Sequence, residues 1–300
     1  MHFLTKKTFA GIVESNPYVD RVFSFVREID EVLPALKAEQ YDHVVDLHHN
    51  LRSMRLKLAL GRPSSAFNKL NFEKWLLVRT GINRLPAVHI VDRYLDTVVQ
   101  FGVKNDGMGL DYFIPADQEI KISDFSPHLF PGNYVSFVIG ATHATKRLLP
   151  SQMIELCSMV RHPVLLLGGK AEAETGAMVK ELSKGLIINA CGKFTLNQSA
   201  SAVKQSGLVL THDTGLMHIA AALRKKIVSI WGNTVPAFGM YPYYPSGADD
   251  YTTVEIKHLS CRPCSKIGHD LCPKSHFRCM QDLSMPALAA DINRWKPMGN

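Results

Sequence analysis

Residues 208–223 read LVLTHDTGLMHIAAAL, and this stretch contains a complete strand, turn and helix pattern. The apolar run over residues 208–211 predicts a buried strand, and a helix is expected to begin near Leu216. A strand that is apolar on both faces and leads directly into a helix is typical of a parallel sheet covered on both sides. The stretch therefore predicts an α/β protein.

The same alternation of apolar runs and amphipathic patterns extends in both directions along the chain. Residues 151–161 predict a helix, because Met153, Leu156, Cys157 and Val160 share one face and Pro150 suits the first helical turn. Together these patterns predict a doubly wound α/β fold. The strands are expected at residues 2–5, 21–25, 43–47, 135–139, 164–167, 186–189, 208–211, 227–231 and 252–256.

Composition excludes several classes of protein. The 300-residue chain is 46% hydrophobic and 20% charged, which is globular and not disordered, collagenous or coiled-coil. The longest strand-like runs, VSFVIGA and VLLLGG, are too short to span a bilayer. The first residues also lack the apolar core of a secretory signal. We therefore expect a cytoplasmic protein.

A chain of this length is expected to form two domains. Residues 105–133 are rich in glycine and proline and predict a linker. We expect an N-terminal domain over residues 1–131 and a C-terminal domain over residues 132–284, facing each other across a cleft. The final helix, within residues 285–300, could pack back on the first domain.

The first predicted domain has three clear strands, whereas the second has six. Its first strand opens one residue after Met1, with no glycine-bearing strand-to-helix turn before it. A βα unit needs roughly 30 residues. We therefore expect this domain to lack its first βα unit; the alternative is a fold that begins at this point.

The net charge of +7 is concentrated in two stretches. Residues 47–72 carry five basic side chains and no acidic one, and residues 257–279 carry five basic side chains and one acidic one. Either stretch could be an ordinary solvated face. The alternative is that both meet an anionic ligand, such as a phosphate, a nucleic acid or an acidic headgroup.

The polar turn after residue 211 is the strongest candidate for a binding site. Asp213 or Thr214 could cap the following helix, and Gly215 would let a ligand approach the backbone closely. Unpaired amides and the positive end of the helix dipole favour a phosphate at this position. A capped helix without a ligand, with His218 as a core histidine, is the alternative.

Two further polar turns follow predicted strands of the second domain. Residues 139–150 offer Thr142 and Lys146, and residues 165–174 offer Glu172, which could reach ribose hydroxyls. Carboxyl ends of parallel strands meet at one edge of a sheet, where open α/β folds bind ligands. Each turn alone could be a plain βα connection, and none is a Walker A loop or a GxGxxG fingerprint. Together they predict a joint site.

The first domain repeats the pattern in VVDLHHNLRS, residues 44–53. A strand there is followed by a polar turn and a basic helix. His89 and Arg93 lie four residues apart, which would place them on one helix face directed at the cleft. Scattered surface polar residues are the alternative.

Six cysteines in a chain of this size do not make a disulfide scaffold. The spacing of four of them allows a structural zinc site with four thiolates, because zinc takes soft ligands in a tetrahedron. Free or redox-labile thiols are the alternative, since the second pair is six residues apart. The four are Cys261, Cys264, Cys272 and Cys279, with His269 and His276 as alternative ligands.

These motifs resemble those of glycosyltransferase family 9, the ADP-heptose:lipopolysaccharide heptosyltransferases. The resemblance covers nearly the whole chain and is most specific in the DTGLMHIAAAL stretch. The matching segments are DLHHNLRS (46–53), HIVDRYL (89–95), GATHATKRLLP (140–150), LLGG (166–169), CGKFTL (191–196), DTGLMHIAAAL (213–223), VSIWGNTVP (228–236) and the Cys-rich tail (261–280).

The resemblance implies a GT-B fold, with two Rossmann-like domains and the donor in the C-terminal one. It implies that Lys146 and Asp213 act at the reacting centre, with no catalytic metal and no other cofactor required; basic groups would stabilise the leaving diphosphate. The implied donor contacts are Thr142 and Lys146 at the phosphates, Glu172 at the ribose, Asp213 near the sugar, and Thr214, Gly215, Met217 and His218 around the pyrophosphate.

On the acceptor side, the resemblance implies roles for His49, Asn50, Arg52 and Arg93. Family members usually begin with a strand and a Ser-x-x-Gly-Asp loop whose Asp is the proposed general base. No such loop precedes His2, so this chain is expected to bind donor and turn over poorly. His48 and His49 also depart from the expected motif, which leaves the acceptor open.

The function expected from the resemblance is inverting transfer of heptose, or a related sugar, from an ADP-sugar to a lipopolysaccharide core. The partners would be the nucleotide-sugar and an anionic lipid-linked saccharide, with peripheral contact at the cytosolic face of the inner membrane. The alternatives are a GT-B enzyme that uses a UDP- or GDP-sugar, a catalytically impaired donor-binding homologue, and a nucleic-acid-binding protein that uses the basic Cys-rich segment. The last lacks the aromatic pattern or finger spacing of such proteins, so no nucleic acid partner is expected.

Overall fold

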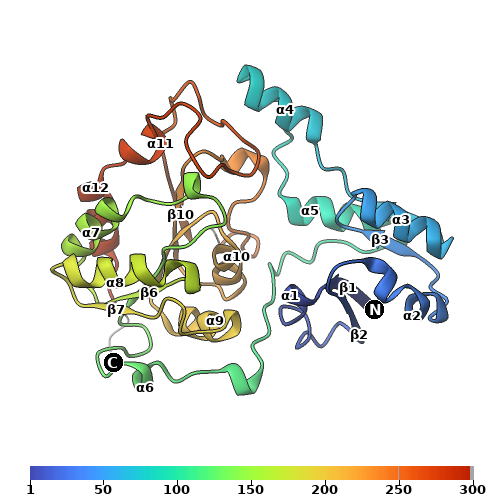
Figure 1. The fold of residues 1–300 in the computed structure, drawn as a ribbon, viewed down its shortest axis with the longest axis horizontal. Helices are drawn as coiled ribbons and strands as arrows, with labels where there is room; N and C mark the ends of the chain where they lie inside the picture. The colour runs from blue at the N-terminus through green and yellow to red at the C-terminus, as the bar shows by residue number, and fades with distance from the viewer. Residues whose placement is uncertain (249, 298–300) are drawn as a thin grey trace. The chain divides into compact units, whose positions relative to one another are not determined.

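The computed structural model describes residues 1–248 and 250–297 (Figure 1). Contacts along the chain divide it into two compact units. Unit 1 comprises Met1–Asn71 and Val88–Gly107, and unit 2 comprises Phe72–Ala87 and Met108–Asn300. Among the described residues, no helix combines the length and the hydrophobicity needed to cross a membrane.

Unit 2 is built on one parallel sheet of six strands in the order β10-β9-β8-β5-β6-β7. Strands β5, β6, β8 and β9 are buried on both faces, which explains their predominantly apolar sequences. The six strands predicted for this part of the chain are present, each within one residue at either end. They are β5 (Val135–Val138), β6 (Val164–Leu167), β7 (Ile187–Asn189), β8 (Leu208–His212), β9 (Ile227–Trp231) and β10 (Tyr251–Glu255).

Helices cover both faces of this sheet and form two hydrophobic cores. Alternate residues of β5 face opposite cores: Phe137 lies in the first and Val138 in the second. The first core is formed with α7 (Pro150–Met159), α8 (Ala173–Leu182) and α12 (Met285–Arg294). The second is formed with α9 (Leu196–Gln205) and α10 (Gly215–Ala222).

The strand order creates a topological switch point between β5 and β8. From β5 the chain proceeds to β6 and β7 on one side of the sheet, and then to β8, β9 and β10 on the other. Open α/β sheets form a ligand crevice beyond the carboxyl ends of the strands at such a point. A ligand site is therefore expected at the loops after β5 and β8.

Two segments pack differently from the sequence expectation. Packing of helix α12 on the first domain was one possibility, but its apolar residues, among them Leu288 and Ile292, lie in the first core of unit 2 against α7 (Figure 1). Part of the predicted linker over residues 105–133 also packs on unit 2. Ile122 and Leu129 are fully buried there, and the Gln205 side-chain amide of α9 donates to the Ile120 carbonyl at 2.7 Å.

Unit 1 contains two separate pairs of parallel strands. β1 (His2–Lys6) pairs with β2 (Arg21–Phe25), and β3 (Val44–Asp46) pairs with β4 (Ser64–Ala66). Strands β1, β2 and β3 match the predicted ones, whereas β4 was not predicted. The helices are α1 (Lys7–Ala10), α2 (Leu33–Ala38), α3 (Leu51–Leu60) and α5 (Ile90–Leu95).

The remaining short elements connect these parts. Helix α4 (Asn71–Thr80) begins at the last residue of the first stretch of unit 1. In unit 2, α6 (Ile122–Phe125) precedes the sheet and α11 (Arg278–Gln281) precedes α12. Six 3-10 turns complete the described elements: η1 (Ile29–Glu31), η2 (Asp96–Phe101), η3 (Ala116–Gln118), η4 (Ala144–Lys146), η5 (Lys170–Glu172) and η6 (Pro236–Phe238).

Candidate functional site

The loops after β5 and β8 meet in an ion pair between Lys146 and Asp213. Lys146 ends η4, Asp213 directly follows β8, and Lys146 Nζ lies 2.6 Å from Asp213 Oδ2. The two side chains are 15% and 10% exposed, so the pair is largely screened from water and retains a small exposed surface. The Thr234 hydroxyl donates to the same carboxylate oxygen at 2.9 Å. The structure thus brings these two predicted residues together at the switch point.

Helix α10 presents its N-terminus at the same edge of the sheet. Thr214 is the N-cap residue, but its side chain makes no capping hydrogen bond, and the Asp213 carboxylate is engaged with Lys146. Gly215 is exposed, and a methyl group added at its Cα would meet no atom within 4 Å. The start of this helix therefore has room for an anion close to its backbone amides.

His218 and Met217, both predicted to surround the pyrophosphate, have different environments. His218 lies one turn into α10, where burial lowers its pKa; the Asp213 carboxylate raises it and Lys146 lowers it further. The imidazole is therefore neutral at pH 7. Met217 is fully buried in the second core, so its side chain belongs to the packing of α10 on the sheet.

Glu172 lies over the carboxyl ends of β5 and β6. Its Oε2 accepts a hydrogen bond from the Gly169 amide at 2.9 Å, and its Oε1 lies 3.3 Å from Arg147 Nη1. An added Cβ at Gly168 would approach the Glu172 side chain within 2.8 Å, so this glycine is needed for the close approach. Glu172 is thus at the predicted edge, paired with an arginine. Thr142 is exposed on the loop after β5.

Three residues that sequence reasoning did not assign complete this site. Thr145 is buried, and its Oγ1 lies 3.1 Å from Asn233 Oδ1, while Thr234 holds Asp213 as described. Asn233 and Thr234 are each 1% exposed. A polar Gly-Asn-Thr turn directly after an apolar strand was the available signal, because β9 neighbours β8 in the sheet.

A buried histidine supports the loop that carries Lys146. His212, the last residue of β8, is completely buried, and its Nε2 accepts a hydrogen bond from the Leu148 amide at 3.0 Å. The net pKa of His212 is about 3. Burial lowers this pKa most and Arg147 lowers it further, whereas a backbone hydrogen bond with Val138 raises it. His212 is therefore a neutral acceptor that fixes the loop to the sheet.

In unit 1, Asp46 organises the turn between β3 and α3. Burial alone would raise its pKa, but the His49 amide, Lys57, Ser53 and the His48 amide lower it below the ordinary value. The shortest of these hydrogen bonds, 2.6 Å, comes from the His49 amide. The carboxylate is thereby committed to holding the turn.

The predicted acceptor-side residues surround this turn but have structural partners. Asn50 caps α3. Its Oδ1 accepts a hydrogen bond from the Ser53 backbone amide, and the Asn50 backbone amide donates to Ser53 Oγ, both at 2.9 Å. His49 Nδ1 lies 3.2 Å from the Phe67 carbonyl, and the Arg52 guanidinium lies over the Phe25 ring at 5.5 Å. His49 and Asn50 thus stabilise the turn itself, and Arg52 packs on an aromatic ring.

His89 and Arg93, which are predicted to lie on one helix face, are both buried, and the Arg93 amide donates to the His89 carbonyl at 3.2 Å. His89 is the N-cap of α5, where its Nδ1 accepts from the Val91 amide at 3.1 Å. Arg93 is 6% exposed, and its Nη1 lies 3.5 Å from the Asn68 carbonyl. Burial lowers the pKa of Arg93. Both side chains therefore lie in the interior.

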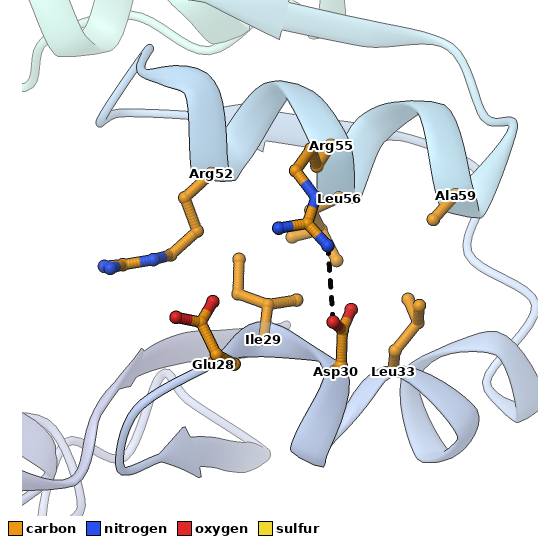
Figure 2. Close-up of a pocket in the computed structure, with 8 residues that line it drawn as sticks. All are labelled: Glu28, Ile29, Asp30, Leu33, Arg52, Arg55, Leu56 and Ala59. Atoms are coloured by element: carbon orange, nitrogen blue, oxygen red, sulfur yellow. Dashed lines mark hydrogen bonds and ion pairs between the residues drawn. The ribbon is translucent and has the colours of Figure 1, made fainter.

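Tertiary contacts neutralise part of the basic stretch over residues 47–72. Lys57 pairs with the buried Asp46 at 3.0 Å, and Arg55 pairs with Asp30 at 3.3 Å. Figure 2 shows Arg52 and Arg55 projecting from α3 toward the segment that carries Asp30. They line a shallow pocket of about 230 Å³ whose charged walls are already partly paired; its lining is Glu28, Ile29, Asp30, Leu33, Arg52, Arg55, Leu56 and Ala59.

The Cys-rich segment does not show the four-thiolate arrangement that its spacing allows. Within residues 1–248 and 250–297, no three histidine, cysteine or carboxylate side chains are arranged to hold a metal. Cys261 Sγ lies 3.7 Å from His276 Nε2. Burial raises the pKa of Cys264 and that of Cys279, and the neighbouring thiols raise both further. The four cysteines are thus near one another without a tetrahedral ligand set.

Comparison with known proteins places this architecture in a family. The sequence profile of glycosyltransferase family 9 (heptosyltransferase) matches residues 30–274, which is more than three quarters of the chain. The matched region includes the switch-point loops, the turn after β9 and most of the Cys-rich segment.

Individual curated relatives share less than a third of their residues with this chain over the matched segments. Lipooligosaccharide heptosyltransferase 2 of Campylobacter jejuni is 28% identical over 139 residues, 44% of this chain and 41% of the relative. Lipopolysaccharide heptosyltransferase 1 of Pseudomonas aeruginosa is 27% identical over 268 residues, 83% of this chain and 68% of the relative. The matched segments span about two fifths of the length of the first curated relatives, 41% and 37%.

One solved structure matches almost the entire fold. The ADP-heptose lipopolysaccharide heptosyltransferase II of E. coli superposes with a TM-score of 0.70 at 16% identity, covering 97% of this chain and 88% of that structure. At this level of identity the comparison establishes the fold, which is of GT-B type.

Proposed function

This chain belongs to glycosyltransferase family 9, and we propose that it binds a nucleotide-diphosphate sugar in unit 2 and transfers the sugar to an acceptor. The observation that supports this proposal most directly is the position of the Lys146–Asp213 pair. It lies at the topological switch point, beside the open N-terminus of α10. A cation and free helix amides at one crevice are suited to a diphosphate.

In the proposed reaction, Lys146 and the first amides of α10 stabilise the nucleoside diphosphate leaving group. In an inverting transfer, an acceptor hydroxyl oxygen bonds to the anomeric carbon while the bond from that carbon to the diphosphate oxygen breaks. The hydroxyl proton passes to a base, and the nucleoside diphosphate departs with the added negative charge. Lys146 and the first amides of α10 would hold that charge in a preorganised, partly dry setting. Asp213 would orient the Lys146 ammonium, with Thr234 fixing the carboxylate.

We propose ADP-heptose as the donor and a metal-independent mechanism. The family description and the name of the E. coli heptosyltransferase support this choice of sugar nucleotide. Glu172, at the ends of β5 and β6, would contact the ribose hydroxyls. Calorimetric titration of ADP, UDP and GDP tests the choice: ADP should bind most tightly, and a preference for UDP or GDP would reassign the donor.

The acceptor is proposed to be an anionic lipid-linked saccharide of the lipopolysaccharide core, met at the cytosolic surface of the inner membrane. Helix α3 supports this, because Leu51 and Leu58 are each 75% exposed and Met54 is 46% exposed on one face. Arg52 lies on the same helix. An apolar stripe with a nearby cation suits the interface of an anionic bilayer.

Sedimentation with vesicles tests this peripheral contact. The chain should co-sediment with phosphatidylglycerol vesicles and remain in solution with phosphatidylcholine vesicles. Leu58→Gln should weaken the association, whereas Leu182→Gln, at a leucine of α8 that is 59% exposed, should not. Equal partitioning of all three proteins would remove α3 from the proposal.

Product analysis tests the transfer itself. The full chain is incubated with ADP-heptose and a heptose-free core acceptor, and the product is detected by mass spectrometry. A mass increase of one heptose, lost in Lys146→Met, supports the transferase. Binding of ADP without any product would identify a donor-binding homologue, and absence of both would refute the proposal.

A further inference from the structure

The Cys-rich segment over residues 257–279 places one arginine inside unit 2. The Arg262 side chain is 4% exposed, and its Nη2 lies 2.7 Å from Glu255 Oε2 at the end of β10. The other basic side chains of the segment, Lys257, Lys266, Lys274 and Arg278, are exposed. Arg262 therefore does not contribute to a basic surface, and its burial calls for a structural explanation.

The guanidinium of Arg262 binds the turn that follows β9. Its Nε donates to the Gly232 carbonyl at 2.5 Å, and its Nη2 donates to the Thr234 carbonyl at 2.7 Å and approaches that of Trp231 at 3.4 Å. Its Nη1 donates to the Ile256 carbonyl at 3.2 Å. A planar fork of donors fixes several carbonyls at once, which a lysine ammonium cannot reproduce.

The opposite side of this turn carries the groups that hold the ion pair. Thr234 Oγ1 donates to Asp213 Oδ2 at 2.9 Å, and Asn233 lies beside Thr145, the residue before Lys146. An added Cβ at Gly232 would stand 2.5 Å from the Thr145 carbonyl oxygen. Because the two loops pack this closely, a shift of the turn would move both.

The same segment also holds the Lys146 loop directly. The His269 amide donates to Thr145 Oγ1 at 2.8 Å, and the His269 carbonyl accepts from the Thr145 amide at 3.1 Å. Arg262 and His269 thus connect one segment to both loops that supply the pair. Neither cysteine chemistry nor a metal is needed for this role.

We propose that Arg262 is a positioning residue for the donor site: by fixing the 232–234 turn it sets the geometry of the Lys146–Asp213 pair. The importance of that pair for transfer rests on the proposed function. The effect of Arg262 on the pair is a separate claim, because it concerns contacts within unit 2 alone.

The test uses four single variants of the full chain and one double variant. Arg262→Met removes the fork, and Arg262→Lys keeps the charge opposite Glu255 without the fork. Thr234→Val removes only the hydroxyl that binds Asp213. Arg278→Met is the matched control, because Arg278 is an exposed arginine of the same segment that pairs with Asp282 at 2.8 Å.

The first measurement needs no nucleotide. Mass spectrometry follows the rate at which a limiting amount of acetic anhydride acetylates Lys146. This acetylation should be slow in the wild-type protein, because the ion pair and burial protect the amine. Arg262→Met and Thr234→Val should each speed this acetylation by about five- to tenfold. Arg262→Lys should fall between them and the wild-type protein, and Arg278→Met should match the wild-type protein.

The second measurement is ADP affinity, including the Arg262→Met/Thr234→Val double variant. If Arg262 acts through the turn, the double variant should lose little more affinity than either single variant. Should Arg262→Met fail to fold, Arg262→Lys takes its place in the cycle.

Two results would overturn the proposal. One is lower thermal stability of the Arg262 variants with wild-type acetylation of Lys146; the other is fully additive losses of ADP affinity. If the wild-type protein binds no nucleotide, the proposed function fails, but the acetylation rates still decide the role of Arg262.

Discussion

Lys146 Nζ and Asp213 Oδ2 lie 2.6 Å apart although the two residues are separated by 67 positions in the sequence. Adjacent parallel strands, β5 and β8, bring them together, and the chain reverses its direction of growth across the sheet between those strands. The order of the strands thus positions the pair. The proposed donor site depends on that relationship.

Replacement of Lys146 should weaken nucleotide binding. Lys146→Met should lower ADP affinity about tenfold or more, because it removes a charged contact and leaves the Asp213 carboxylate facing the diphosphate. The double variant Lys146→Met/Asp213→Asn should recover part of the loss. Calorimetry measures the affinities. The control is Lys204→Met, which breaks a surface ion pair with Glu119, also at 2.6 Å, and should bind ADP normally.

Gly215 offers a test by addition of a single methyl group. Gly215→Ala should not destabilise the free protein, since an added Cβ meets nothing within 4 Å. It should weaken ADP binding about tenfold if a diphosphate rests on these amides, because the methyl group would occupy its place. Gly11→Ala, which also has open space around its Cβ, should change neither property. Wild-type affinity in Gly215→Ala would place the diphosphate elsewhere.

The buried His212 predicts a specific acid sensitivity. Its pKa is about 3 in the folded protein against an ordinary value of 6.5, so the folded state binds fewer protons than the unfolded state between these values. His212 therefore reduces stability as the pH falls from 6.5 toward 3, by up to about 1.4 kcal/mol per pH unit.

Denaturant unfolding at several pH values checks this contribution. His212→Gln, which retains an acceptor for the Leu148 amide, should flatten the dependence of the unfolding free energy on pH over this range. His128→Gln, at an exposed histidine, should leave the slope unchanged. A slope in His212→Gln equal to that of the wild-type protein would contradict the assignment.

The cysteines should behave as free thiols of unequal reactivity. Cys157 and Cys191 are buried, and burial raises the pKa of each to about 12, so they should label slowly with a thiol reagent at pH 8. Cys261 and Cys272 are partly exposed and should label first. Labelling of these two that begins only after a chelator is added would instead show a bound metal.

Much of the fold could be predicted from the sequence, because the decisive strands are apolar on both faces. Most residues of β8 and β9 are apolar, and the ends of these strands follow from the polar turns after them. Strand β4 could not be predicted: Ser64–Ala66 has no apolar pattern and is held by pairing with β3. The position of α12 could not be predicted either, because the pattern of an amphipathic helix does not specify which sheet face the helix covers.

The site could be predicted only in outline. The polar turns after β5, β6 and β8 placed Lys146, Glu172 and Asp213 at one edge, which the sheet order explains. The contacts that support the site could not be predicted from the sequence. Arg262 is about 30 residues from the 232–234 turn and binds its backbone carbonyls, which leave no sequence pattern. Likewise, the spacing of His89 and Arg93 did not reveal that His89 is the N-cap of α5 or that both side chains are buried.

The structure of this chain with ADP bound would test the account most directly. We expect the diphosphate within hydrogen-bonding distance of the Gly215 amide and of Lys146 Nζ, and the ribose beside Glu172. A structure determined at saturating ADP in which this crevice is empty, or in which the nucleotide lies away from the ends of β5 and β8, would contradict the proposed donor site.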